Sequence, residues 1–171
     1  MSTYYVRQKF FKLREDYFIE NEKGENVYSV KSNFEVVRKK IALCDLSGNE
    51  IYFFKEKIFK IRPRFYIFDN EASSENKENR LGVINKKGFF LPTYKLKING
   101  EKYVIRGFMG FPFKYTVHKN KEIIAKIKKQ VLNIRDVYAV ECLKESESAV
   151  CVAIALMIDI LRSQDMLKLF R

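Results

Sequence analysis

The stretch AVCVAIALMIDIL, residues 149–161, decides the fold of this chain. It contains one charged residue, Asp159, in thirteen positions, and its apolar residues leave no polar stripe at the 3.6-residue period of a helix. A helix of this composition is apolar on nearly all sides, so other parts of the protein have to surround it. Ser146 or Ser148 is placed to cap its start, and Arg162 lies near its end, where the helix dipole favours a cation. We therefore expect a buried C-terminal helix.

A membrane-spanning segment is an alternative interpretation of the same stretch. A spanning helix needs about 20 predominantly apolar residues, whereas Glu145 and Glu147 precede this run and Arg162 and Asp165 follow it. A membrane anchor and a helix lying in the membrane interface are the alternatives to a buried core. The shortness of the run favours the buried core.

Composition predicts one domain made mainly of strands. A chain of 171 residues with 47% hydrophobic content is long enough for one good core, so we expect a single domain over residues 1–171. Its 15 Phe and 10 Tyr are spread along the chain with many Ile and Val, which favours strands everywhere except the C-terminus. The formal net charge of +12 attracts anions such as nucleic acid, acidic lipid headgroups or acidic proteins.

The N-terminus and the cysteines predict a cytoplasmic protein. No apolar stretch follows Met1, because the charged and polar residues 7–9 come almost at once, so no signal peptide is visible. Cys44, Cys142 and Cys151 are odd in number and lie among apolar residues. This usage is typical of reduced, buried thiols.

A unit of strand, turn and strand recurs along the chain. Gly24 and Gly48, in the turns of the first two units, are 24 residues apart, which is a repeat period. In the fourth unit Lys95 and Lys97 alternate with apolar residues before Asn99-Gly100, the strongest hairpin signal in the chain. The six expected units pair residues 17–19 with 27–31, 41–45 with 51–55, 65–69 with 81–84, 94–98 with 103–105, 113–117 with 123–127, and 131–134 with 138–140.

Two segments interrupt this pattern. Residues 70–80 replace the turn of the third unit with polar residues and contain no Gly or Pro, so we expect a solvated, mobile loop. Gly107-Phe108-Met109-Gly110 superficially resembles the Gly-x-x-Gly loop that clamps an RNA backbone, but it lies inside a strand repeat without flanking helices. We interpret its glycines as bends or bulges.

Six units of two strands predict about twelve antiparallel strands with no second sheet to cover them. So long a sheet curls, and closure removes both exposed edges. Twelve strands leave an interior too wide for their own side chains to fill. The expected fold is therefore mainly β, a closed antiparallel barrel of about twelve strands around the central hydrophobic C-terminal helix.

Several short motifs follow one another along the chain. They are Tyr5-Val6-Arg7-Gln8-Lys9-Phe10-Phe11, the turns at Gly24 and Gly48, Lys55-Glu56-Lys57-Ile58-Phe59, Pro63-Arg64-Phe65-Tyr66-Ile67, Ile105-Arg106-Gly107-Phe108-Met109-Gly110 before Phe113, and the helix with Asp159. In this order they resemble the LURP-one-related family, within the tubby C-terminal-like superfamily that also includes the phospholipid scramblases. The resemblance covers nearly the whole chain, and it implies the same twelve-stranded barrel threaded by a helix.

No constellation of catalytic or metal-binding residues is visible. His118 is the only histidine and follows Val117 in an alternating strand, where a solvated histidine is ordinary. There is no zinc spacing, no P-loop and no dinucleotide fingerprint, so we expect no metal, no cofactor and no enzyme activity. Asp159 needs a structural partner on a buried helix, with a ligand-reading role inside the barrel as the alternative.

The best functional candidate is a cluster of five cations opposed only by Glu56. Pro63 bends the chain there and brings basic groups together at a rim, where they can hold phosphate. The cluster consists of Lys55, Lys57, Lys60, Arg62 and Arg64. A plain solvated surface is the alternative reading of the same residues.

These observations predict a non-enzymatic binding domain. Its expected ligands are anionic lipid headgroups, met through peripheral contact with a membrane, or an acidic protein partner. Nucleic-acid binding is the less favoured alternative, because most Tyr and Phe occupy core-facing strand positions. A scramblase-like membrane-associated protein is the third.

Overall fold

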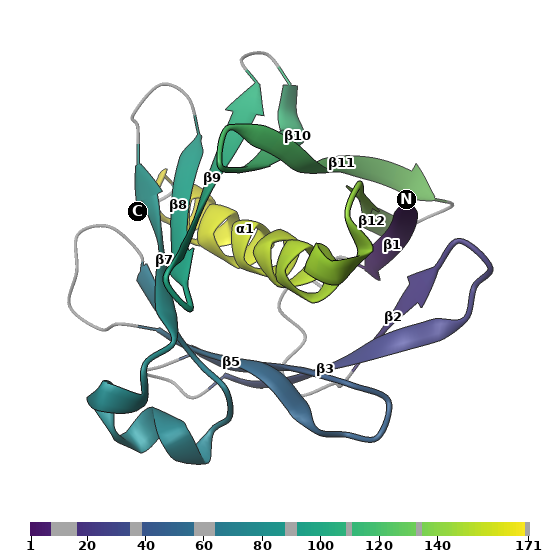
Figure 1. Ribbon diagram of the computed structural model, residues 1–171. Coiled ribbons are helices and arrows are strands. Elements are labelled where there is room, and N and C mark those ends of the chain that lie inside the picture. Colours follow the sequence, from purple (N-terminus) through teal and green to yellow (C-terminus); the bar gives the residue numbers. More distant parts are fainter. Residues whose placement is uncertain are drawn as a thin grey trace.

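The computed structural model describes residues 1–7, 17–34, 39–56, 64–87, 92–108, 111–132 and 135–169. Within these residues twelve strands form one closed antiparallel barrel, and helix α1 (Ser148–Leu169) runs through it (Figure 1). This confirms the expected fold. The strands are β1 (Ser2–Arg7), β2 (Tyr17–Asn21), β3 (Asn26–Phe34), β4 (Lys39–Cys44), β5 (Glu50–Glu56), β6 (Arg64–Phe68), β7 (Gly82–Lys87), β8 (Thr93–Ile98), β9 (Glu101–Phe108), β10 (Phe111–Lys119), β11 (Glu122–Leu132) and β12 (Arg135–Cys142).

The barrel closes through its first strand, which corrects one part of the predicted pattern. Each strand pairs with its neighbours in the sequence, and β1 pairs with β12, with Ser2 opposite Cys142 and Arg7 opposite Val137. Residues 131 and 132 were expected to begin the sixth unit, but they continue β11. Within β11 these residues still pair with β12, with Leu132 opposite Arg135, and the other neighbour of β12 is the N-terminal strand.

The interior is filled by α1. Every residue from Val150 to Ile158 is buried, and the inward side chains of the strands, including Tyr94, Tyr115 and Tyr138, pack in the same apolar cluster. Burying one such apolar side chain stabilises the fold by roughly 1.5–3 kcal/mol. A gap between α1 and strands β5 to β8 measures about 10 Å³, which is about the space of one water molecule. It is lined by Tyr52, Phe54, Ile67, Ile84, Leu96, Ile98, Val150, Ala153, Ile154 and Met157.

The hairpin turns have the backbone conformations that their residues predict. Asn99 and Gly100 both have positive φ, 48° and 79°, as a type I′ turn requires. At the β10–β11 hairpin the register shifts beside His118, so Ile124 points into the core while Ile123 is 42% exposed. Alternation through Ile123, Ala125 and Ile127 predicts that all three face the same side, but strict alternation does not hold across a bulge.

Residues 70–80 are more ordered than a mobile loop implies. They are largely exposed, as expected, but they form two short 3₁₀ helices, η1 (Ala72–Glu75) and η2 (Lys77–Asn79). Ser74 is buried and accepts hydrogen bonds from Lys55, while Glu71 pairs with Lys40 of β4 at 3.3 Å. The segment therefore lies against the outer faces of β4 and β5. A second, smaller apolar cluster lies on the outer side of β4 to β6 and consists of Ala42, Cys44, Phe53 and Phe68, with Tyr66 packed against it.

Candidate functional site

One end of the barrel carries the turns after β2, β4, β8 and β10, together with the start of α1. We call this end the entry rim. It also carries the 3₁₀ turn η3 (Glu145–Glu147), which leads directly into α1. A polar cluster at this rim is the most connected group of titratable side chains among the described residues.

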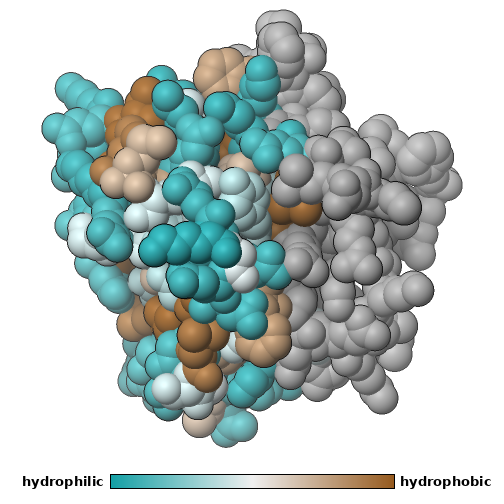
Figure 2. All heavy atoms as spheres, turned by 90° about the vertical axis from the view of Figure 1, so that its right-hand side faces the viewer, coloured by the Kyte–Doolittle hydropathy of each residue, from teal (hydrophilic) through white to brown (hydrophobic). Residues whose placement is uncertain are grey.

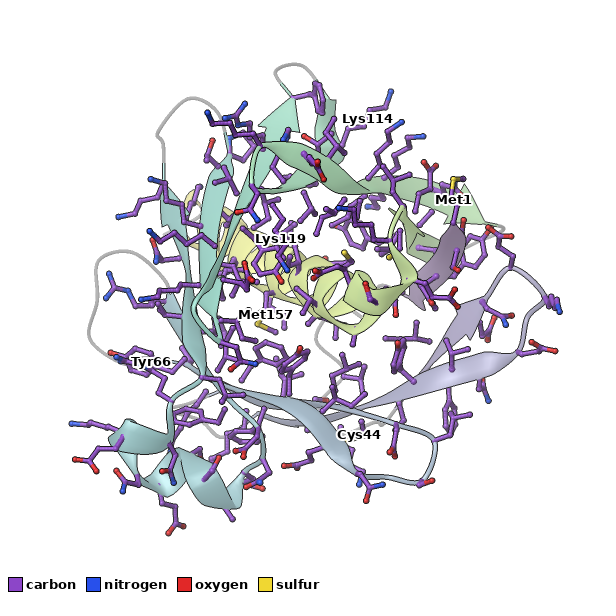
Figure 3. The ribbon with its side chains drawn as sticks, in the orientation of Figure 1. Met1, Cys44, Tyr66, Lys114, Lys119 and Met157 are labelled. Atoms are coloured by element: carbon purple, nitrogen blue, oxygen red, sulfur yellow. The ribbon has the colours of Figure 1, made fainter. Side chains whose placement is uncertain are left out.

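Glu147 is the centre of this rim cluster. Its Oε1 lies 2.6 Å from Nζ of Lys119 on β10, and its Oε2 accepts a 2.8 Å hydrogen bond from the Tyr103 hydroxyl on β9. The side chains of Glu147 and Lys119 are only 15% and 20% exposed. Lys119 points toward the start of α1, whereas Lys114 on the same strand points away from the barrel (Figure 3). The cluster thus ties the first turn of the central helix to two strands.

The pKa shifts of these groups reflect the same contacts. Burial raises the pKa of Glu147, but the hydrogen bonds from Lys119 and Tyr103 outweigh it, so the net pKa lies below the usual value. Burial, reinforced by the hydrogen bond to Glu147, raises the pKa of Tyr103 to about 12. The hydrogen bond to Glu147 also raises the pKa of Lys119. At neutral pH the three groups are therefore a carboxylate, a neutral phenol and an ammonium ion.

A second contact anchors the helix beside the first. The hydroxyl groups of Tyr28 on β3 and Ser148 are 3.1 Å apart. Ser148 has helical backbone angles, φ −60° and ψ −45°, so it is the first residue of α1 rather than the cap expected there. Since the polar groups at the rim satisfy one another, the cluster is an anchor for α1, and it presents no activated nucleophile.

His118 is separated from the cysteines in the core. Its Nε2 lies 2.9 Å from the Thr116 hydroxyl, and both residues belong to the outward-facing set of β10. Cys142 and Cys151 are fully buried in the interior cluster. This arrangement brings no nucleophile and base together from these three residues.

The outer faces of β8, β9 and β11 carry a set of exposed cations, which we call the basic face. Lys95 and Lys97 project from β8, Lys102 and Arg106 from β9, and Lys126 from β11. All five are exposed, and none has an ion pair or hydrogen bond to another described residue. The register places Arg106 opposite Thr93 on one side and Thr116 on the other, and Thr116 lies opposite Lys126. These cations therefore lie on one side of the barrel, with Thr116 of the intervening strand β10 between Arg106 and Lys126.

Lys97 and Lys102 lie directly opposite each other across the β8–β9 pair. Like charges in this position destabilise a sheet, by up to roughly 1 kcal/mol for a cross-strand pair. By contrast, Lys128 and Glu141, on β11 and β12, form an ion pair at 3.0 Å. The pair Lys97 and Lys102 has no such acidic partner among the described residues, so it lowers the stability of the fold and is not explained by folding alone.

The structure describes two of the five residues in the predicted anion site. Lys55, on β5, donates hydrogen bonds of 3.1 and 3.4 Å to the carbonyl oxygen and hydroxyl of Ser74. Arg64 is the first residue of β6, two positions before Tyr66, which lies opposite Lys55. Lys57, Lys60 and Arg62 lie outside the described residues. The anion site at this cluster stays a prediction.

The structure also describes Asp159, for which the sequence predicts a structural partner. Asp159 is partly buried on α1 and takes part in a polar or electrostatic interaction, as a carboxylate on this helix requires.

The sequence analysis did not predict the basic face, although the sequence contains a signal for it. A two-residue Asn99-Gly100 turn places residues 98 and 101 opposite each other, and so also Lys97 and Lys102.

The side of the barrel away from β8 and β9 has a different distribution of polar and apolar residues. Figure 2 views the side formed by β12, β1 and β2, and its coloured part is mostly hydrophilic with small, separate apolar patches. Exposed apolar residues are scattered singly on most protein surfaces and need no partner. In the described part of the chain, no helix is sufficiently long and apolar to cross a membrane.

Comparisons with known proteins agree with the barrel. The family model for LURP-one-related proteins matches residues 2–159. The uncharacterized protein YxjI of Bacillus subtilis (strain 168) is 21% identical over 165 residues, which cover 96% of each chain. An X-ray structure of an Arabidopsis thaliana protein superposes with a TM-score of 0.60 at 15% identity, covering 92% of this chain and 91% of that one. The family match spans all twelve strands of the barrel and α1 as far as Asp159, so this chain belongs to the LURP-one-related family.

Proposed function

We propose that this protein is a non-enzymatic binding domain that contacts anionic phospholipid headgroups at a membrane surface through its basic face. The observation that carries the proposal is the row of exposed, unpaired cations on β8, β9 and β11, with Lys97 directly opposite Lys102. Neighbouring strands lie about 4.8 Å apart, so a sheet presents such cations as a closely spaced array. The filled interior directs the proposal to the outer surface, since a gap of about 10 Å³ leaves no room for a lipid chain.

The charge on this face is large enough for reversible binding. Each Lys or Arg near an anionic membrane contributes about 1 kcal/mol, so five contribute roughly 5 kcal/mol before screening. The attraction acts within a Debye length, which falls from about 10 Å at 0.1 M salt to about 3 Å at 1 M. Binding of this kind is therefore moderate and strongly dependent on salt.

Nucleic acid is the second anionic ligand to consider. Proteins that bind single strands without sequence preference combine cations with exposed aromatic rings on which bases stack. Tyr94 on β8, Tyr103 on β9 and Tyr115 on the intervening strand β10 are buried and face the interior. On β8 and β9 the exposed ring among the described residues is Phe108, at the end of β9. A single ring is not a platform on which successive bases stack, which favours the lipid surface.

Co-sedimentation with vesicles tests the proposal. We expect the intact protein to sediment with vesicles of phosphatidylcholine and phosphatidylserine in about a 3:1 ratio and to be released as salt rises. It should stay in the supernatant with pure phosphatidylcholine. Absent binding, or binding that salt does not weaken, contradicts the proposal. Tighter binding to short DNA or RNA, measured by fluorescence anisotropy, would favour the alternative.

A pair of matched variants locates the binding surface. The double substitution Lys97→Ala with Lys102→Ala should weaken vesicle binding about 30-fold, from about 1 kcal/mol per residue. The control is Lys23→Ala with Lys77→Ala, on the β2–β3 turn and in η2, where both residues are exposed. Each pair lowers the formal net charge of +12 by the same two units, so equal losses would show that overall charge, not the basic face, determines binding.

The cluster predicted from the sequence is tested in the same assay. Lys57→Ala with Lys60→Ala changes the net charge equally. A larger loss from this pair than from the Lys97 and Lys102 pair would move the proposed contact to the segment that joins β5 and β6.

A further inference from the structure

An exposed aromatic residue lies on the basic face. Phe108 ends β9, and 49% of its surface is exposed. The inward residues of this strand are Tyr103 and Ile105, both buried, so Val104, Arg106 and Phe108 follow one another on the outer side. An exposed aromatic ring next in line to an unpaired arginine combines an apolar group with a cation on one surface.

This combination matches the chemistry of a bilayer surface. Cations interact with the phosphate and carboxylate groups of lipid heads, while aromatic rings enter the boundary between headgroups and acyl chains. Phe108 lies opposite Phe111 where the β9–β10 register shifts, so it projects from an irregular end of the strand pair rather than from its flat middle. An end position lets the ring reach past the plane of the sheet.

We infer that Phe108 inserts into the interface of an anionic bilayer while Arg106 and the neighbouring lysines hold the headgroups. This inference rests on the proposed function and adds the orientation of the bound domain, with the β9–β10 end of the basic face nearest the acyl chains. It predicts that membrane affinity contains an apolar part that salt does not remove.

A single-tryptophan probe tests the inference, because the chain has no Trp of its own. In the Phe108→Trp variant we expect the emission to shift to the blue on adding the phosphatidylserine vesicles, and brominated lipids to quench it. Phe18→Trp is the matched control, since Phe18 is 51% exposed on β2, with four strands between β2 and β9 in the shorter direction around the barrel. Its emission should not change.

Substitutions that remove the ring provide a second measurement. Phe108→Ala should weaken partition into these vesicles about fivefold to tenfold, from loss of about half of the transfer energy of a phenylalanine. Phe108→Leu should retain most of the affinity, and Phe18→Ala should leave it unchanged. These variants also decide the question if the tryptophan variant does not fold.

The outcomes separate the inference from the proposed function. If the unmodified protein does not sediment with the vesicles, both fail. If it does sediment but the emission of bound Phe108→Trp is unchanged, or Phe108→Ala binds as well as the unmodified protein, the basic face still stands and the insertion of Phe108 is wrong. A blue shift for Phe18→Trp alone would place the membrane on the opposite side of the barrel.

Discussion

Replacing Glu147 by glutamine tests whether the rim cluster holds the central helix in place. The carboxylate accepts from Lys119 at 2.6 Å and from Tyr103 at 2.8 Å, and its side chain is 15% exposed. Each hydrogen bond to a charged group contributes roughly 1.5–3 kcal/mol. Glutamine keeps the shape and one acceptor but removes the nearer of the two counter-ions of Lys119, leaving Glu101 at 3.7 Å. The Lys119 side chain is 20% exposed and can also regain some water. We expect the free energy of unfolding to fall by about 2 kcal/mol.

Urea unfolding followed by circular dichroism measures this change. The matched control is Glu145→Gln, because Glu145 belongs to the same 3₁₀ turn but is exposed, and its side chain has no hydrogen bond or ion pair to another described residue. Its stability should stay within about 0.5 kcal/mol of the unmodified protein. A double-mutant cycle with Lys119→Met should show a coupling of about 1 kcal/mol or more. Equal stability of the Glu147 and Glu145 variants would refute the anchoring role of the cluster.

Four smaller predictions follow from the same contacts. Because the pKa of folded Glu147 lies below its usual 4.5, its stabilising effect is complete above pH 4.5 and is lost as the pH falls through the folded value, so acid titration should destabilise the unmodified protein relative to Glu147→Gln. Because the pKa of folded Tyr103 is raised from 10.0 to about 12, unfolding titrations between these values should show a loss of stability that Tyr103→Phe lacks. Gly82→Ala should cost about 2–3 kcal/mol in urea unfolding, since an added Cβ meets the Lys97 carbonyl oxygen at 2.0 Å; a cost below that of Gly24→Ala, where space is open, would contradict this reading. Lys55→Ala should speed proteolytic cleavage within residues 70–80, because it removes the hydrogen bonds to Ser74, and an unchanged cleavage rate would show that the segment is held by other contacts.

The sequence predicts most of the barrel because local signals and long-range packing agree there. Alternation on both sides of Asn99-Gly100 determines a hairpin and its register, and the apolar run from Ala149 to Leu161 has to be enclosed. The segment over residues 70–80 was harder to predict. Its polar composition indicates a loop, but local hydrogen bonds, such as Ser74 N–H to the Glu71 carbonyl oxygen, form its 3₁₀ turns. Its contacts with Lys40 and Lys55, on β4 and β5, attach it to the barrel.

Closure and the candidate site needed information that alternation does not contain. β12 pairs with β11, the preceding strand, but its other neighbour is β1, more than 120 residues earlier in the chain. A repeat of adjacent strands does not predict that second pairing. The basic face arises because strands from two hairpins, β8–β9 and β10–β11, place their outward residues on one side of the barrel, whereas a count of cations favours the dense run from Lys55 to Arg64. The spacing of cations along the chain therefore predicts the cluster from Lys55 to Arg64, whereas the register between strands identifies the basic face.

Lysine acetylation, mapped by mass spectrometry with and without phosphatidylserine vesicles, tests the central claim most directly, because it reports each lysine separately. Membrane contact through the basic face predicts slower acetylation of Lys95, Lys97, Lys102 and Lys126 on the vesicles, with Lys23 and Lys77 unchanged. Protection of Lys23 and Lys77 instead, or no protection in protein that is bound to the vesicles, would contradict the assignment of the membrane-binding surface to β8, β9 and β11.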